Sequence, residues 1–180
     1  WKIDRAFVGV GGQHVESLNS TGQVAVTAHH REVTREDISR AIAVARELDL
    51  PVTVLGGGSN VLIADGGVRG VVIRVHGGDV ARIDQGHIRA DGGVTINGLV
   101  RWTISHGVAG LEAWAGTPGT VGGAVHGNAH FRGRLISELI DTVTLATLDG
   151  NVVDVPAAAM EFGYDYSRLH RTHEVVVSVD

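Results

Sequence analysis

A run of three glycines, Gly56–Gly58, constrains this chain more than any other feature, because it separates two apolar runs. The run before it, Val52–Leu55, predicts a short strand, and Val61–Ile63 predicts a second extended segment. Residues without side chains let successive backbone N–H groups converge on an anion, and the adjoining Ser59-Asn60 pair adds short polar donors. The loop therefore predicts either an anion-binding turn or a glycine-rich hairpin turn without a ligand.

A second glycine-rich loop spans residues 115–124 and contains four glycines, two threonines and Pro118. It has no lysine, and Gly-Lys-Ser/Thr is absent from the chain, so neither loop is a P-loop for nucleoside triphosphates. Two donor-rich loops without a cation suit a dinucleotide diphosphate better than a transferable phosphate. A third candidate, residues 9–14, begins like a dinucleotide fingerprint but lacks its last glycine, so we do not assign a Rossmann site there.

Composition excludes several classes of function. The net charge of −5, without a long basic run, argues against nucleic-acid binding. The chain has no Cys, which excludes disulfides, thiolate zinc sites and cysteine nucleophiles and agrees with a cytoplasmic protein. No apolar stretch has the length of a membrane span, so we expect no membrane partner.

The order of the expected elements favours an α+β fold over a doubly wound parallel sheet, because several strands follow one another too closely for helical crossovers. Two helices are expected, one starting near Thr34 with a capping-box arrangement and one over 96–106 with Leu99, Val100 and Ile104 facing inward. Beyond the strand at 52–55, further strands are expected at 71–75, 80–84, 87–90, 141–148, 152–155 and 174–179.

At the two loops the sequence resembles the UDP-N-acetylenolpyruvoylglucosamine reductase family. The matching stretches are 54–65 with Gly70, and 110–124 with Asn128-Ala129. A looser third match runs from Phe162-Gly-Tyr-Asp-Tyr-Ser-Arg168 to 175–179. The resemblance covers residue 31 onward and leaves residues 1–30 poorly matched.

The resemblance implies a two-lobed FAD-binding fold of the vanillyl-alcohol-oxidase (PCMH) type, with lobes at about 31–90 and 91–180. It implies non-covalent FAD, with NADPH as hydride donor, a UDP-sugar substrate, and the reduction of an enolpyruvyl double bond in peptidoglycan synthesis. The implied cofactor-binding residues are Leu55, Gly56, Gly57, Gly58, Ser59, Asn60, Gly116, Thr117, Pro118, Gly119, Thr120, Gly122, Gly123 and Val177.

Departures from the family pattern leave the catalytic residues unassigned. The family's Tyr-Arg pair, whose Arg stabilises the enolate, reads Tyr164-Asp165, and a carboxylate cannot take over that role. The chain starts at Trp1 and stops in a strand-like run, so we expect a part lacking the substrate domain and unable to complete the cycle alone. Another FAD-dependent oxidoreductase of this fold and a non-catalytic flavin-binding module remain alternatives.

Ten histidines raise the question of a metal site. His126 and His130 are spaced i, i+4, and His170 and His173 are spaced i, i+3, which would suit ligation on helices. A third, carboxylate ligand is not evident, and no His-Glu-x-x-His motif occurs. We therefore expect surface histidines or hydrogen-bond donors at the edge of the core, and no metal.

Overall fold

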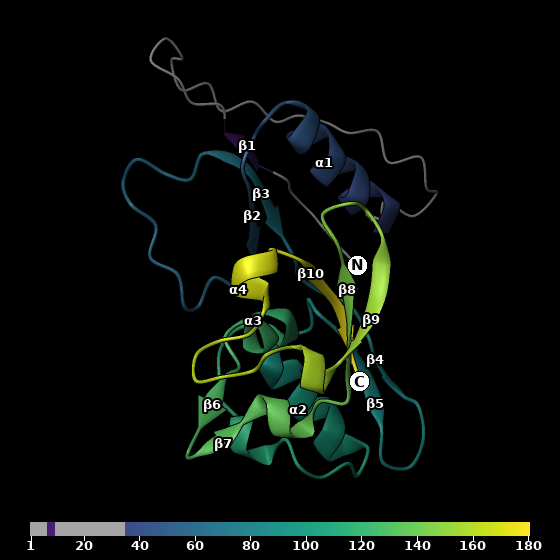
Figure 1. The fold of residues 1–180 in the computed structure, drawn as a ribbon. Helices are drawn as coiled ribbons and strands as arrows, with labels where there is room; N and C mark the ends of the chain where they lie inside the picture. Colours follow the sequence, from purple (N-terminus) through teal and green to yellow (C-terminus); the bar gives the residue numbers. More distant parts are fainter. Residues whose placement is uncertain (1–6, 10–34) are drawn as a thin grey trace.

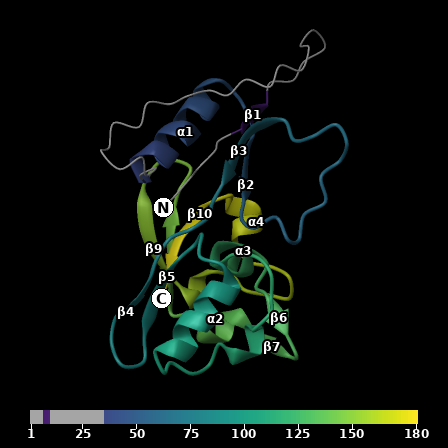
Figure 2. The same ribbon diagram turned by 180° about the vertical axis from the view of Figure 1, so that it is seen from behind.

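The computed structural model describes residues 7–9 and 35–180, which build an α+β fold around two sheets (Figure 1). Helix α1 lies at one end of the molecule and helices α2 and α3 at the other, with strand β10 between them (Figures 1 and 2). The expected fold class is confirmed, and so are the strands expected from 52 to 179 except the extended run at 61–63, with shifts of a few residues at their ends.

The smaller sheet has the strand order β1-β3-β2, formed by Phe7–Gly9, Gly70–Arg74 and Val52–Leu55. Strands β2 and β3 are parallel, with Val52 opposite Val71. Parallel neighbours cannot be joined by a tight hairpin, so the connecting residues 56–69 must travel back along the sheet. This topology places the first glycine loop at the carboxyl end of β2 and keeps it outside the sheet.

The larger sheet is antiparallel, in the order β4-β5-β10-β8-β9. Its strands are Val80–Arg82, Ile88–Asp91, Val175–Val179, Thr142–Ala146 and Val152–Pro156. All five residues of the central strand β10 are buried. Both of its faces are covered, which explains why four of its five residues are valine.

Two hydrophobic clusters lie on opposite faces of β10. Helix α1 (Arg35–Glu47) contributes Ile42 and Ala45 to the cluster that contains Val175 and Val177. Helices α2 (Ile96–Ser105) and α3 (Val121–His126) pack on the other face, in the cluster that contains Val176. The remaining short elements are η1 (Glu112–Trp114), β6 (His130–Phe131), β7 (Arg134–Leu135), η2 (Ile136–Leu139), η3 (Ala157–Ala159) and α4 (Leu169–Thr172).

Two local expectations were wrong. Residues 61–63 form no strand and are exposed, Leu62 to 99%, because they lie in the segment that returns between the parallel strands β2 and β3. Ile104 is 60% exposed, since the inward face of α2 is made by other residues and Thr103 takes the next buried position. Helix α2 ends as expected, with Gly107 at a φ of 65°.

Three expectations are not decided by these elements. The helix cap at Thr34 and most of the 9–14 fingerprint lie outside the described residues. The division into lobes near residue 90 stays a prediction. The chain passes from the smaller sheet to the larger one between Arg74 and Val80. Strand β3 ends at Arg74, and β4, which begins at Val80, pairs with β5, the neighbour of β10.

Candidate functional site

The two glycine loops lie against each other although about 60 residues separate them in the sequence. A Cβ atom added to Gly56 would lie 2.4 Å from Thr120 Oγ1, and one added to Gly57 would lie 3.1 Å from Gly119 Cα. A Cβ at Gly119 would lie 2.8 Å from Ser59 Oγ. Glycine is therefore required for the loops to approach this closely.

The first loop presents unused backbone donors. Residues 57–60 are exposed, and their N–H groups make no hydrogen bond to another described residue. Gly58 has a φ of 73°, a left-handed conformation that other residues rarely adopt. A row of free N–H groups beside such a residue is the arrangement that binds anions in protein turns.

The second loop is held by hydrogen bonds to neighbouring segments and within itself. Gly116 N–H donates to Asn97 Oδ1 at 2.7 Å, and Thr117 N–H donates to the Trp114 carbonyl at 2.9 Å. Thr120 caps helix α3, and its hydroxyl accepts from Gly123 N–H at 3.3 Å. These donors are occupied, so the loop is a rigid support whose remaining N–H groups, at residues 119 and 120, lie beside the first loop.

Other predicted site residues have structural neighbours that explain their identity. Gly122 packs α3 against the larger sheet, where an added Cβ would lie 3.1 Å from the Gly92 carbonyl oxygen. Val177 is buried in β10, and its carbonyl accepts from Gly92 N–H at 2.8 Å. Leu55 is half-buried at the end of β2, and Pro118 is exposed. Their contact with a cofactor stays a prediction.

The third matching stretch folds into a tight turn with Tyr164 and Asp165 at its tip. Gly163 N–H donates to the Tyr166 carbonyl at 3.0 Å, and Asp165 has a φ of 51°. The carboxylate of Asp165 lies 3.3 Å from His130 Nδ1, and the His130 ring lies 4.7 Å from the Tyr164 ring.

Two fully buried polar side chains fix this turn to the rest of the site. Asn128 Nδ2 donates to the Gly163 carbonyl at 2.9 Å, while its Oδ1 accepts from Ser137 N–H at 3.2 Å. Ser167 Oγ donates to the His126 carbonyl at the end of α3, at 2.7 Å. Both residues occur in the matched stretches, but their sequence context gave no signal that they contact other segments. Buried hydrogen-bonded groups of this kind set a unique geometry.

Arg168 does not supply the positive charge missing at Asp165. Its guanidinium makes two hydrogen bonds to the Glu174 carboxylate, at 3.0 and 2.7 Å. Burial opposes ionisation of Glu174, but the hydrogen bonds from Arg168 and Thr172 outweigh it and lower the pKa of the carboxyl below its usual range. Arg168 is therefore a structural partner of Glu174, in the segment that leads into β10.

Three histidines, His126, His170 and His173, lie close together near this turn. The His126 ring contacts the His170 ring, with centroids 4.1 Å apart, and His170 also stacks near Tyr166. Partial burial, together with the nearby His170 and His173, lowers the pKa of His126. Within residues 7–9 and 35–180, no group of three or more metal-ligating side chains is close enough to bind an ion.

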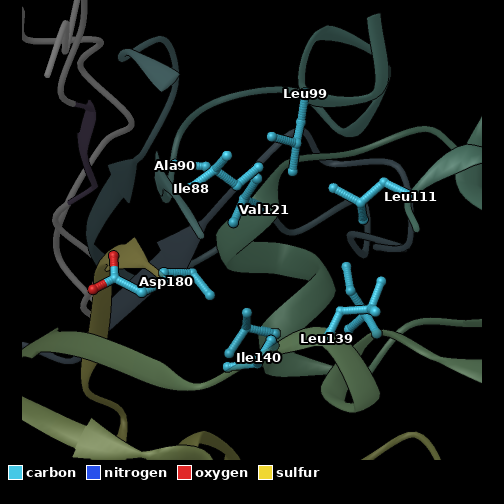
Figure 3. Close-up of a pocket in the computed structure, with 11 residues that line it drawn as sticks. Ile88, Ala90, Leu99, Leu111, Val121, Leu139, Ile140 and Asp180 are labelled. Atoms are coloured by element: carbon cyan, nitrogen blue, oxygen red, sulfur yellow. The ribbon is translucent and has the colours of Figure 1, made fainter. Parts of the chain in front are cut away.

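An apolar cavity of about 60 Å³ lies elsewhere, between α2, α3, η2 and the larger sheet (Figure 3). Its walls are mostly aliphatic, and Leu99, Leu111 and Ile140 point into it (Figure 3). None of the predicted cofactor-binding residues lines it. The cavity is too small for a dinucleotide, so we regard it as a packing defect in the core.

Comparisons with known proteins assign this arrangement to a family. The family model described as "FAD binding domain" matches residues 31–156, which include both glycine loops. The chain belongs to the FAD binding domain family. In the described part of this FAD binding domain, no helix is long and apolar enough to cross a bilayer.

Relatives of this FAD binding domain confirm the expected resemblance. A UDP-N-acetylenolpyruvoylglucosamine reductase of Geobacillus thermodenitrificans is 36% identical over 146 residues, covering 81% of this chain and 48% of the relative. The crystal structure of the corresponding reductase from Thermus caldophilus is 31% identical with a TM-score of 0.67, over 81% of this chain and 51% of that chain. The chain thus spans about half the length of these relatives.

A more distant structure confirms the fold type. A VAO-type flavoprotein from Myceliophthora thermophila has a TM-score of 0.60 at 16% identity, over 87% of this chain and 30% of that chain. The fold that the family resemblance implies, that of vanillyl-alcohol-oxidase-type flavoproteins, is therefore confirmed.

Proposed function

We propose that this chain is the FAD-holding part of a UDP-N-acetylmuramate dehydrogenase, which reduces UDP-N-acetylenolpyruvoylglucosamine with NADPH during cytoplasmic peptidoglycan synthesis. The observation that carries the proposal is the contact between the two glycine loops, in a chain 36% identical to a reductase of that name. The hydride donor, the UDP-sugar and the cytoplasmic location belong to the proposal.

The donor set fits a non-covalent dinucleotide diphosphate. Residues 57–60 offer N–H groups that donate to no described residue, and the loops approach so closely at Gly56 and Gly57 that side chains there would fill the space between them. No histidine or cysteine lies in the first loop to attach a flavin covalently. The chain's own contribution is to hold the diphosphate with backbone dipoles, without a bound cation.

Bound FAD would supply hydride transfer at this site. The residues of this chain would then position the cofactor and exclude water around it. The second loop suits positioning, since Thr120 is buried and its cap fixes the start of α3. In the family, an Arg stabilises the negative charge that develops on the substrate. Asp165 stands at that position here, so no residue matched to the family takes this role.

The first test is a visible absorption spectrum of the purified chain after incubation with FAD and desalting. The proposal expects retained flavin bands, and a folded chain without flavin would overturn it. Anaerobic addition of NADPH should then bleach the retained flavin. In a protein that spans the full length of the relatives, UDP-N-acetylenolpyruvoylglucosamine should reoxidise it.

A different FAD-dependent oxidoreductase of this fold is the second candidate, and Asp165 favours it. A carboxylate beside His130 suits removal of a proton from an alcohol or amine during its oxidation. Bleaching of the bound flavin by simple alcohols or amines, with no response to NADPH, would select this candidate over the reductase.

A further inference from the structure

A groove of about 410 Å³ lies beside the start of helix α2 and shares no residue with the predicted FAD site. Its walls are residues 77–80, which lead into β4, and residues 93–95 with Gly98 and Trp102. Small-molecule sites in proteins commonly have volumes of about 300 to 1,000 Å³. The groove therefore has room for a ring system with its substituents, which the apolar core cavity does not.

Glycine backbone forms one side of this groove. Gly77 and Gly78 have φ values of 75° and 111°. A Cβ added to Gly93 would lie 2.5 Å from the Gly77 carbonyl oxygen, and one added to Gly78 would lie 2.5 Å from Asp91 Cβ. The two segments thus pack backbone against backbone, and these glycines place no side chain in the groove. A flat ring can approach the peptide groups there directly.

Trp102 supplies an aromatic wall. Its indole stacks on the His106 ring, with centroids 3.9 Å apart and an angle of 10° between the planes. His106 follows Trp102 by four residues and Gly98 precedes it by four, so the three share one face of the helix. Gly98 has no side chain to cover the indole, and it lines the groove together with Trp102. An indole supported from behind in this way suits stacking by a planar base.

Asp79 supplies the polar group. Its backbone is fixed to Asp91, because its N–H donates to Asp91 Oδ2 at 3.0 Å and its carbonyl accepts from Asp91 N–H at 3.0 Å. The Asp79 carboxylate makes no hydrogen bond or ion pair to another described residue, and among the described residues that line the groove it alone is charged. A free carboxylate accepts from the hydroxyls of a ribose and repels a phosphate.

The groove adjoins both glycine loops. Ile96 N–H, at the start of α2, donates to the Gly119 carbonyl of the second loop at 3.0 Å. Val75 N–H, just before the glycines of the groove, donates to the carbonyl of Leu55, just before the first loop, at 2.8 Å. A ring in the groove would therefore lie near backbone donors that suit phosphate. This position favours a nucleoside over other neutral rings.

We propose that this groove binds a nucleoside with a free ribose diol. The base stacks on Trp102, and the ribose hydroxyls donate to Asp79. The nucleoside is either the adenosine of FAD itself or part of a second nucleotide, such as a UDP-sugar. An adenosine with a 2′-phosphate, as in NADPH, is disfavoured because its phosphate would face the carboxylate. The inference does not depend on the proposed function, since FAD is not needed to form the groove.

NMR of the indole N–H groups in the nitrogen-15-labelled, FAD-free chain tests the proposal. The chain has three Trp residues, and Trp102→Phe identifies the Trp102 signal. Adenosine should shift that signal saturably and leave the signal of the fully buried Trp114 unchanged. The analogue 2′,3′-dideoxyadenosine has the same base without the diol and should bind roughly tenfold more weakly. Asp79→Ala should weaken adenosine binding to a similar degree and remove this preference.

Asp149→Ala is the matched control, because Asp149 is also exposed but lies on the β8–β9 turn. It should bind adenosine like the wild type. The proposal is overturned if adenosine and uridine at millimolar concentration both leave the Trp102 signal unchanged. It is equally overturned if dideoxyadenosine binds as tightly as adenosine.

The same titrations after saturation with FAD identify the source of the nucleoside. Loss of adenosine binding would assign the groove to the adenosine of FAD. Retained binding would assign it to a second nucleotide, and tighter binding of uridine would then point to a UDP-sugar. A chain that binds adenosine but retains no FAD would overturn the proposed function alone, which separates the two failures.

Discussion

The contact between Gly56 and Thr120 gives the sharpest test of the two-loop site. In Gly56→Ala the new Cβ would lie 2.4 Å from Thr120 Oγ1, whereas an ordinary contact begins near 3.4 Å. Thr120 is 3% exposed and caps α3, so it has little freedom to rotate away. The more exposed first loop must therefore move by about 1 Å, and any donor that moves with it is carried out of hydrogen-bonding range.

The expected loss follows from the number of donors displaced. One hydrogen bond to a charged diphosphate is worth about 1.5 to 3 kcal/mol, so FAD affinity should fall roughly ten- to a hundredfold. The cost to folding should be smaller, about 1 kcal/mol, because the crowding is relieved by an exposed loop. Titration of FAD by fluorescence quenching measures the first quantity, and urea unfolding without FAD measures the second.

Two variants make the result interpretable. Gly66→Ala lies in the same connecting segment, where an added Cβ meets nothing within 4 Å, and it should bind FAD like the wild type. Thr120→Ala removes the clashing hydroxyl and should partly restore the affinity of Gly56→Ala in a double-mutant cycle. Wild-type FAD affinity in Gly56→Ala would refute the view that the loops jointly hold the diphosphate.

Three further predictions concern stability. Asn128→Ala removes the acceptor of Ser137 N–H and one of the two donors to the Gly163 carbonyl, both partly buried, and should lower the free energy of unfolding by about 1 to 3 kcal/mol in urea titration. Arg168→Leu should lower the free energy of unfolding at neutral pH. Because the pKa of Glu174 is lowered in the folded chain, the difference from the wild type should shrink as the pH falls below about 4.3. A difference that does not depend on pH would contradict this account. The pKa of His126 is lowered by burial and by His170, so the unfolded chain binds this proton more readily than the folded chain does. The stability should therefore fall as the pH drops below about 6.5. In thermal melts, His126→Gln should reduce this dependence of the melting temperature on pH.

The local structure could be predicted from the sequence wherever one physical rule dominated. The valine-rich run at 175–179 indicated a strand, and the 3.6-residue period at 96–106 indicated a helix that ends before Gly107. The two glycine loops were recognised because glycine, having no Cβ, lets backbone N–H groups converge and backbones approach closely. Those loops also carried the family resemblance that the comparisons confirmed.

The tertiary structure decided what sequence patterns could not express. Parallel pairing of β2 with β3 turned 61–63 from an expected strand into an exposed connection, because strand direction is set by long-range hydrogen bonds rather than by apolar content. Likewise, Asp165 lies beside His130 in a turn that Asn128 and Ser167 hold through buried side chains, and Arg168 is bound to Glu174. Sequence determined which chemical groups are present, while packing between distant segments decided which of them meet.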